Sequence, residues 1–282
     1  VSLWWMGKYA QVVMGPAGSG KSTYCQMIYE HCVNIGRVVH VVNLDPAAEH
    51  FAYPVSIDIR DLISVDDVVE ELDYGPNGAL VFCMEHLMSN IDWLQDKIEN
   101  FSDDYLIFDA PGQIELYSHI PVMRDLAACL QNWGYNLCGL YLIDALFMTD
   151  PAKFISGTLS CLSAMIQLEL PHINILTKCD LLESTVNIDK YIDADMTALV
   201  DDLHKVTDKR FHKLNEAIGT LIESFNLVSY IPLDRREEEN IANVLGQIDH
   251  VLQFGEDEDV KDTMRQYDDN LEKLPGGMIA QD

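Results

Sequence analysis

Short, wholly apolar runs alternate along the chain with longer segments in which apolar residues recur at helical spacing. Short runs rich in valine, isoleucine and leucine predict buried strands, and the segments between them predict helices. The predicted strands are Ala10–Met14, Val38–Leu44, Tyr105–Phe108, Leu137–Ile143, Ile173–Leu176 and Leu227–Ile231. The predicted helices are Lys21–Cys32, Leu80–Ile98, Ile120–Trp133, Ala152–Leu168, Phe211–Phe225 and Ile241–Phe254. Because both faces of such strands must be covered, the pattern predicts a three-layer α/β domain with a mostly parallel central sheet.

The apolar pattern changes at two places, which sets the predicted domain organisation. Residues 181–210 are polar with scattered apolar positions and predict a helical insertion. Residues 255–282 hold nine acidic and three basic residues, a composition typical of an acidic, partly disordered tail. We therefore predict one folded domain over residues 1–254, followed by this tail.

The charge of the chain excludes several classes of partner. Its 282 residues include 46 acidic and 18 basic side chains, a net charge of −28. Such a surface repels phosphates, so direct binding of nucleic acid is not expected. No run of about 18 apolar residues occurs, so we predict no membrane span. The seven cysteines form no C-x-x-C pair, which favours reduced thiols in a cytosolic or nuclear protein.

The segment GPAGSGKS, residues 15–22, follows the first predicted strand, opens a helix and matches G-x-x-x-x-G-K-S. Its glycines let backbone N–H groups face a triphosphate, and the helix N-terminus adds positive potential. We expect Lys21 to reach the β- and γ-phosphates, and the Ser22 hydroxyl to bind Mg²⁺. The predicted nucleotide contacts are Gly15, Pro16, Ala17, Gly18, Ser19, Gly20, Lys21, Ser22 and Thr23. Pro16 stands where MinD-type ATPases carry a second lysine, so that ATPase subclass is disfavoured.

The segment FDAPGQIE, from residue 108, ends a predicted strand with an aspartate and continues as D-x-x-G. Asp109 would lie beside the phosphate loop and hold Mg²⁺ through water. Gly112 can offer its N–H to a γ-phosphate because no side chain blocks the approach. Gln113 and Glu115 follow where a group that orients water is needed. The alternative is that the aspartate only caps a helix.

The segment NLDPAAE, residues 43–49, ends the second predicted strand. Asp45 is therefore placed to meet the metal or the attacking water, at the same edge of the sheet. The competing interpretation is an Asp-Pro turn that caps a helix.

The segment TKCD, residues 177–180, follows the strand Ile173–Leu176 and is the candidate for reading the base. A carboxylate at Asp180 accepts two hydrogen bonds from guanine N1 and N2, which adenine cannot supply. The aliphatic stem of Lys178 can cover the base plane, and Thr177 belongs to the same motif. A surface turn with no ligand is the alternative.

Four consecutive turn-forming residues, Gly75-Pro76-Asn77-Gly78, lie between segments whose pattern is otherwise helical. Pro76 fixes φ and stiffens the turn, and Asn77 and Gly78 can adopt left-handed geometry before the helix that starts at Leu80. Turn chemistry accounts for the two glycines. It does not require an asparagine beside a proline, so Asn77 is a candidate functional residue within the loop at residues 74–78.

Taken together, these segments resemble the GPN-loop GTPases, a P-loop NTPase family of the signal-recognition and MinD-like class. The resemblance extends over residues 9–255 and rests on GPAGSGKST, NLDPAAE, GPN, DAPGQIE, TKCDLL and SYIPL. VMGPAGSGKSTYC, NLDPAAEHF, CMEHL and ISGTLSCLSAMIQLELP look most like the third eukaryotic paralogue of that family.

The resemblance implies an Mg²⁺-dependent GTP hydrolase that works as a dimer. The loop formed by Gly75, Pro76 and Asn77 of one subunit would project into the nucleotide site of the other. By motif match, Asp45, Gln113 and Glu115 would position the metal and the attacking water. The implied partner is a paralogous GPN-loop GTPase or a second copy of this chain.

The third paralogue is further implied to support the assembly and nuclear import of RNA polymerase II, and so to contact polymerase subunits. A cytoplasmic protein that shuttles to the nucleus would follow. Two alternatives stay open: a scaffold subunit that uses nucleotide only for stability, and a P-loop kinase of small molecules. Such a kinase needs a basic pocket for its acceptor, whereas the arginines are scattered along this sequence. They include Arg60, Arg124, Arg210, Arg235 and Arg236.

Overall fold

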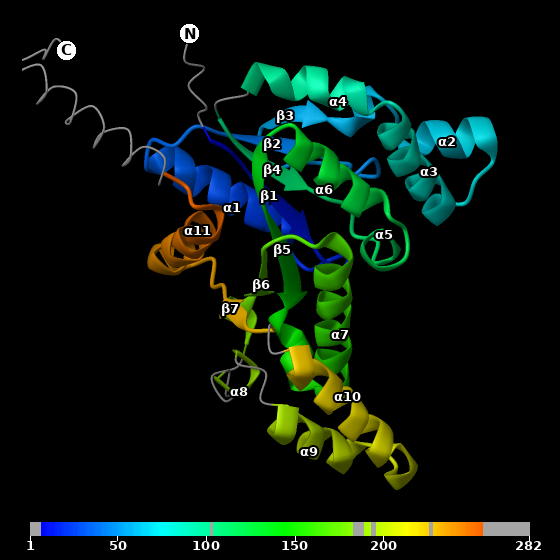
Figure 1. The fold of residues 1–282 in the computed structure, drawn as a ribbon, viewed down its shortest axis with the longest axis vertical. Helices are drawn as coiled ribbons and strands as arrows, with labels where there is room; N and C mark the ends of the chain where they lie inside the picture. Colours follow the sequence, from blue (N-terminus) through cyan, green and yellow to red (C-terminus); the bar gives the residue numbers. More distant parts are fainter. Residues whose placement is uncertain (1–6, 102–103, 183–188, 193–195, 226–227, 256–282) are drawn as a thin grey trace, which may run out of the picture.

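The computed structural model describes residues 7–101, 104–182, 189–192, 196–225 and 228–255. Within them, seven strands form one parallel sheet in the order β3-β2-β4-β1-β5-β6-β7 (Figure 1). The strands are β1 (Lys8–Met14), β2 (Val39–Asn43), β3 (Val55–Asp58), β4 (Tyr105–Asp109), β5 (Tyr135–Asp144), β6 (His172–Thr177) and β7 (Tyr230–Pro232). The helices are α1 (Lys21–Asn34), α2 (Val65–Leu72), α3 (Pro76–Ser89), α4 (Ile91–Ile98), α5 (Glu115–Ser118), α6 (Val122–Asn132), α7 (Pro151–Leu168), α8 (Asp189–Ile192), α9 (Met196–Val206), α10 (His212–Phe225) and α11 (Glu238–Leu252).

Helices cover both faces of the sheet, which confirms the predicted three-layer fold. Helices α1 and α11 pack together on one face, whereas α3, α6 and α7 lie on the other (Figure 1). Strand β1 shows the cause: Ala10 and Val12 belong to the core under α6 and α7, and Val13 belongs to the core under α1. Gln11 is the polar exception in this strand, and Tyr24 and Tyr105 satisfy its buried amide at 2.9 and 2.7 Å.

The segment predicted as one helix over Leu80–Ile98 is two helices. Helix α3 ends at Ser89 and α4 begins at Ile91. Between them, Nδ2 of Asn90 donates to the carbonyl of His86 at 2.9 Å, and the backbone of Asn90 leaves helical geometry. Strand β3 and helix α2 were not among the predicted elements. The sequence of β3, VSID, is short and half polar, and therefore reads as a loop.

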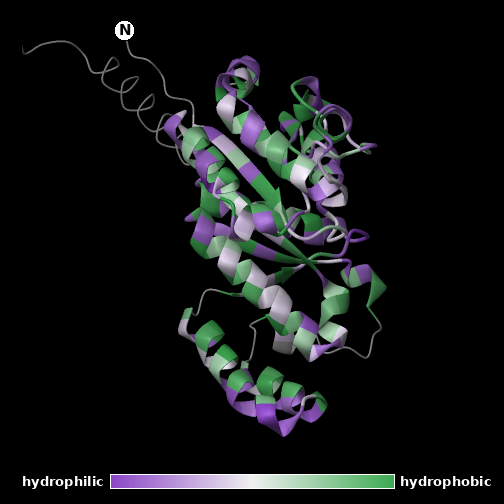
Figure 2. Cartoon of the chain, turned by 90° about the vertical axis from the view of Figure 1, so that its right-hand side faces the viewer, coloured by the Kyte–Doolittle hydropathy of each residue, from purple (hydrophilic) through white to green (hydrophobic). Residues whose placement is uncertain are grey.

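Helices α9 and α10 form a hairpin that extends away from the sheet beside α7 (Figures 1 and 2). The close packing uses Gly219 of α10, where an added Cβ would lie 2.7 Å from Val200 of α9. Helix α9 falls in the insertion predicted over residues 181–210, and its packing partner α10 follows that segment. Residues 183–188 and 193–195 of this insertion, Leu227 of the last predicted strand and residues 256–282 of the predicted tail lie outside the described residues.

None of the helices in the described part of the chain combines the length and the apolar character that a bilayer span requires.

Candidate nucleotide site

The candidate site lies where the strand order reverses. Strand β1 runs between β4 and β5, so the loop that leads from β1 to α1 opens at the carboxyl edge of the sheet, where parallel α/β folds bind ligands. Gly15 begins this loop with φ 138°, and an added Cβ would meet the carbonyl of Leu142 at 2.4 Å. Only glycine therefore fits there, as the motif predicts.

Lys21 crosses the phosphate loop. Its Nζ donates to the carbonyls of Gly15 at 3.2 Å and Pro16 at 3.3 Å. Burial lowers the pKa of this ammonium, while Asp109 and Asp45 act in the opposite direction. A triphosphate would supply the anionic partner that these neutral carbonyls replace.

The D-x-x-G segment approaches the same loop. An added Cβ on Gly112 would lie 2.9 Å from the Cα of Ala17 and 3.1 Å from the Nζ of Lys21. The structure thus brings Gly112 against the phosphate loop, and a side chain at this position would displace backbone.

Two acidic side chains, Asp45 and Asp109, lie close to Lys21. Asp109 ends β4 with 3% of its surface exposed, and its carboxylate has Tyr53 and Ser22 as hydrogen-bonding neighbours. Burial raises the pKa of Asp109, against these hydrogen bonds and Lys21. Asp45 is half-buried, and burial likewise raises its pKa while its bond to the Ala47 amide opposes the shift.

This donor set fits Mg²⁺, which prefers hard oxygen ligands and commonly takes only a few from protein. Among the described residues, no group of three histidine, cysteine, aspartate or glutamate side chains could hold a metal ion unaided. Ser22, Asp45 and Asp109 would accordingly contribute some of the ligands, and nucleotide phosphates and water would supply the others.

The Gly-Pro-Asn segment is the first turn of α3 rather than a loop. Gly75 caps the helix, Pro76 occupies its first position, and the Ala79 amide bonds the Gly75 carbonyl at 2.8 Å. The left-handed geometry expected of Asn77 and Gly78 is wrong, since neither has a positive φ. Proline is already set for the first helical position, so the helix starts there instead of at Leu80.

Asn77 lies at the candidate site of its own chain. Its Oδ1 accepts a hydrogen bond of 3.4 Å from Nε2 of Gln113, immediately after Gly112. Glu115 starts α5 with its side chain exposed. The predicted catalytic residues Asn77 and Gln113 therefore meet, although they are 36 positions apart.

The base-reading motif is tied directly to the phosphate loop. The buried Thr177 places its Oγ1 2.6 Å from the carbonyl of Ser19 and 3.2 Å from that of Ile143. A cavity of about 210 Å³ lies between the two motifs, lined by residues that include Gly20, Thr23, Lys178, Asp180, Leu233 and Arg235. Nζ of Lys178, one of the lining residues, donates to Oδ2 of Asp144 at 2.7 Å.

Three comparisons place the chain among known proteins. Residues 13–254 match the family model described as a conserved hypothetical ATP binding protein. The chain is 53% identical over 277 residues to "GPN-loop GTPase 3" of Dictyostelium discoideum, with 97% of each chain covered. It is 52% identical over 262 residues to the protein of the same name from Danio rerio, covering 91% of this chain and 92% of that one. This chain belongs to the GPN-loop GTPase family.

A solved structure supports the fold of this GPN-loop GTPase family member. An apo-form GTPase of Pyrococcus abyssi superposes with a TM-score of 0.69 at 24% identity, covering 85% of this chain and 96% of the other. At this identity the likeness concerns the arrangement of strands and helices alone.

The sequence alone did not mark several residues that lie at the candidate site. Those that bind predicted site residues include Tyr53, Asp144 and Arg235. Asp144 directly follows the predicted strand Leu137–Ile143 and ends β5, a signal that could have marked it. Arg235 forms an ion pair with Asp180 at 3.4 Å. The one sequence signal for this pair is that Arg235 follows shortly after the SYIPL segment. Nothing in the local sequence connects Tyr53 with Asp109.

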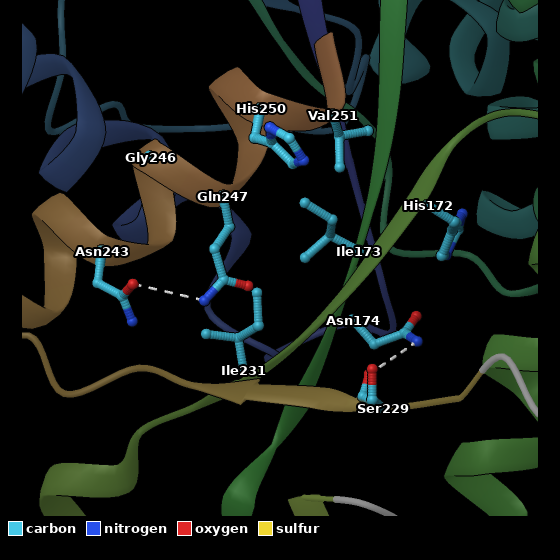
Figure 3. Close-up of a pocket in the computed structure, with 10 residues that line it drawn as sticks. All are labelled: His172, Ile173, Asn174, Ser229, Ile231, Asn243, Gly246, Gln247, His250 and Val251. Carbon is cyan, nitrogen blue, oxygen red and sulfur yellow. Dashed lines mark hydrogen bonds between the residues drawn. The ribbon is translucent and has the colours of Figure 1, made fainter. Parts of the chain in front are cut away.

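A second cavity lies elsewhere, between α11 and the strands β6 and β7 (Figure 3). It measures about 400 Å³, and Gly246 gives it room because no heavy atom lies within 4 Å of an added Cβ. Amide and imidazole side chains such as Asn243, Gln247 and His250 line it, without a lysine or a carboxylate. It therefore lacks the groups that bind a triphosphate and a metal.

Proposed function

We propose that this chain binds GTP together with Mg²⁺ and hydrolyses it. The observation that carries the proposal is that the phosphate loop and the TKCD segment are hydrogen-bonded to each other and line one cavity. Thr177 bonds Ser19 across 158 positions, and Asp180 lines the cavity between the two segments. A carboxylate in that position favours guanine, because guanine N1 and N2 can both donate to it and adenine offers no such pair of donors.

The phosphate end of the site supplies charge stabilisation. Lys21 and the loop amides would bind the β- and γ-phosphates, and the Gly112 amide is close enough to the loop to join them. When bound, Mg²⁺ would neutralise phosphate charge between Ser22, Asp45 and Asp109. Gln113, with Glu115 nearby, would orient the attacking water, and Asn77 would add a neutral donor and acceptor.

We further propose that the protein works as a dimer, with a second copy or a paralogous GPN-loop GTPase. The exposed first turn of α3 favours this, because it carries Asn77 to the mouth of the site. A role in the assembly and nuclear import of RNA polymerase II, with contacts to its subunits and cytoplasmic–nuclear shuttling, rests on the family resemblance.

Guanine recognition is tested by replacing Asp180 with asparagine and measuring the affinity of fluorescent GTP and xanthosine triphosphate. The variant should lose about 100-fold or more in GTP affinity, because the amide has only one acceptor and opposes N–H to N–H. It should bind xanthosine triphosphate better than the wild-type chain does. Unchanged GTP affinity would remove Asp180 from the base site.

Hydrolysis across the dimer is tested by mixing two inactive variants, Asn77→Ala and Gln113→Ala. If Asn77 serves the partner's site, one of the two sites in a mixed dimer holds both side chains and the other holds neither. Each mixed dimer should then show about half of the activity of a wild-type dimer. If Asn77 serves its own site, each site lacks one group and the mixture stays inactive. Each variant alone, at the same total concentration, is the control.

A further inference from the structure

Tyr53 makes an unusual contact for a residue in a connecting segment. It lies between β2 and β3, only 4% of its surface is exposed, and its hydroxyl donates to Oδ2 of Asp109 at 2.5 Å. The same hydroxyl has the Ser22 side chain as a hydrogen-bonding neighbour. Tyr53 thus binds the carboxylate that β4 brings to the candidate metal site, beside Ser22 of α1.

The ring of Tyr53 is held in place from behind. It packs against Phe51, with ring centroids 5.5 Å apart, and the guanidinium of Arg60 lies 4.8 Å from the Phe51 ring. Arg60 is itself fixed by Asp58 at 2.6 Å and by the Ala48 carbonyl at 2.8 Å. The segment is therefore anchored on both sides of Tyr53, and the hydroxyl has little freedom to leave Asp109.

Other buried tyrosines show how particular this contact is. The hydroxyl of Tyr230 binds Thr158 at 2.9 Å, and that of Tyr24 binds Gln11 at 2.9 Å. Those bonds satisfy neutral groups inside the core. The bond of Tyr53 instead ends on a buried carboxylate, and a charge-assisted bond of this kind is short and directional.

We propose that Tyr53 is a positioning residue of the Mg²⁺ site. By donating to Oδ2, it fixes the rotation of the Asp109 carboxylate, which would be one of the groups that hold Mg²⁺. The inference rests on the proposed function, because it assumes that Ser22 and Asp109 serve Mg²⁺.

The test is Tyr53→Phe in the full chain, with a fluorescent non-hydrolysable GTP analogue. Nucleotide dissociation is followed over a range of Mg²⁺ concentrations and in EDTA. Loss of a partner that orients a metal ligand typically weakens metal binding by about 10- to 100-fold. We expect the Mg²⁺ concentration for half-maximal retention of nucleotide to rise at least about tenfold, with the dissociation rate in EDTA unchanged.

Tyr230→Phe is the matched control, since it removes a buried hydroxyl that is remote from the metal residues. It should lower stability while the Mg²⁺ dependence stays as in the wild-type chain. Phe51→Leu keeps the Tyr53 hydroxyl but loosens its ring, and should raise the Mg²⁺ requirement by a smaller factor. It also serves as the second variant if Tyr53→Phe folds poorly.

Ser22→Ala separates failure of this inference from failure of the proposed function. If the wild-type chain retains nucleotide equally with and without Mg²⁺, the proposed metal site itself is wrong. If Ser22→Ala abolishes the Mg²⁺ dependence while Tyr53→Phe behaves as the wild-type chain, only the role of Tyr53 is overturned. A change in Tyr53→Phe that appears equally in EDTA would also overturn it, because it would indicate a merely structural effect.

Discussion

Replacing Thr177 with valine removes the hydroxyl that joins the two halves of the nucleotide site. The side chain is 4% exposed, and Oγ1 lies 2.6 Å from the Ser19 carbonyl and 3.2 Å from that of Ile143. A hydroxyl has one proton, so the shorter contact is the principal bond. Valine keeps the β-branch and the volume, so the change removes polarity with little change in shape.

The cost follows from burial. Ser19 is 2% exposed, and its carbonyl would lose this partner in a setting from which water is excluded. A buried acceptor left without its hydrogen bond costs roughly 1–3 kcal/mol, so we expect about 2 kcal/mol of lost unfolding free energy. The phosphate loop would also lose its tie to β6, and GTP affinity should fall about tenfold, which corresponds to about 1.4 kcal/mol.

Urea unfolding without nucleotide measures the first quantity, and titration with fluorescent GTP measures the second. Thr220→Val is the matched control: that hydroxyl bonds the Glu216 carbonyl at 2.9 Å on an exposed helix face, where water can replace it. It should change stability by less than about 0.5 kcal/mol. If Thr177→Val is as stable as this control, the bond to Ser19 does not hold the site together.

Other regions of the molecule give three more expectations. Gly112→Ala should abolish GTP binding in a titration, because the added Cβ would clash with the backbone of the phosphate loop. Gly246→Ala on α11, where an added Cβ meets no atom, should raise the free energy of unfolding in urea by about 0.5–1 kcal/mol. Asp249→Ala should lower the free energy of unfolding by about 1.5–3 kcal/mol, because Arg37 donates two hydrogen bonds of 2.7 and 2.9 Å to Asp249 between half-buried side chains. An unchanged free energy of unfolding would show that this pair does not stabilise the fold. Burial lowers the pKa of His172 to about 4, below the unfolded value near 6.5, so the unfolded chain binds more protons between these values and stability falls as pH drops through that window. His172→Phe should flatten this part of a stability–pH curve, and an unchanged slope would contradict the assignment.

Local patterns in the sequence predicted most of the strands and helices, and they marked the segments that the structure brings together at the candidate site. Apolar runs mark strands because each face of a parallel strand meets a helix, as Val12 and Val13 do on opposite faces of β1. The phosphate loop is recognisable because its function needs particular backbone geometry over eight consecutive residues, including the positive φ of Gly15. Such requirements are satisfied within one segment, so the segment alone displays them.

Long-range pairing was decided only by the tertiary structure. The order of the strands places β4 between β2 and β1, and this brings Tyr53 to Asp109 across 56 positions. Thr177 reaches Ser19 across 158 positions, and Arg37 reaches Asp249 across 212. No local periodicity encodes such contacts, because they depend on which surfaces fit when the chain is packed. The start of α3 at Pro76 belongs to the same class: the turn residues permit either a loop or a helix, and packing of Ala79 and Leu80 into the core selects the helix.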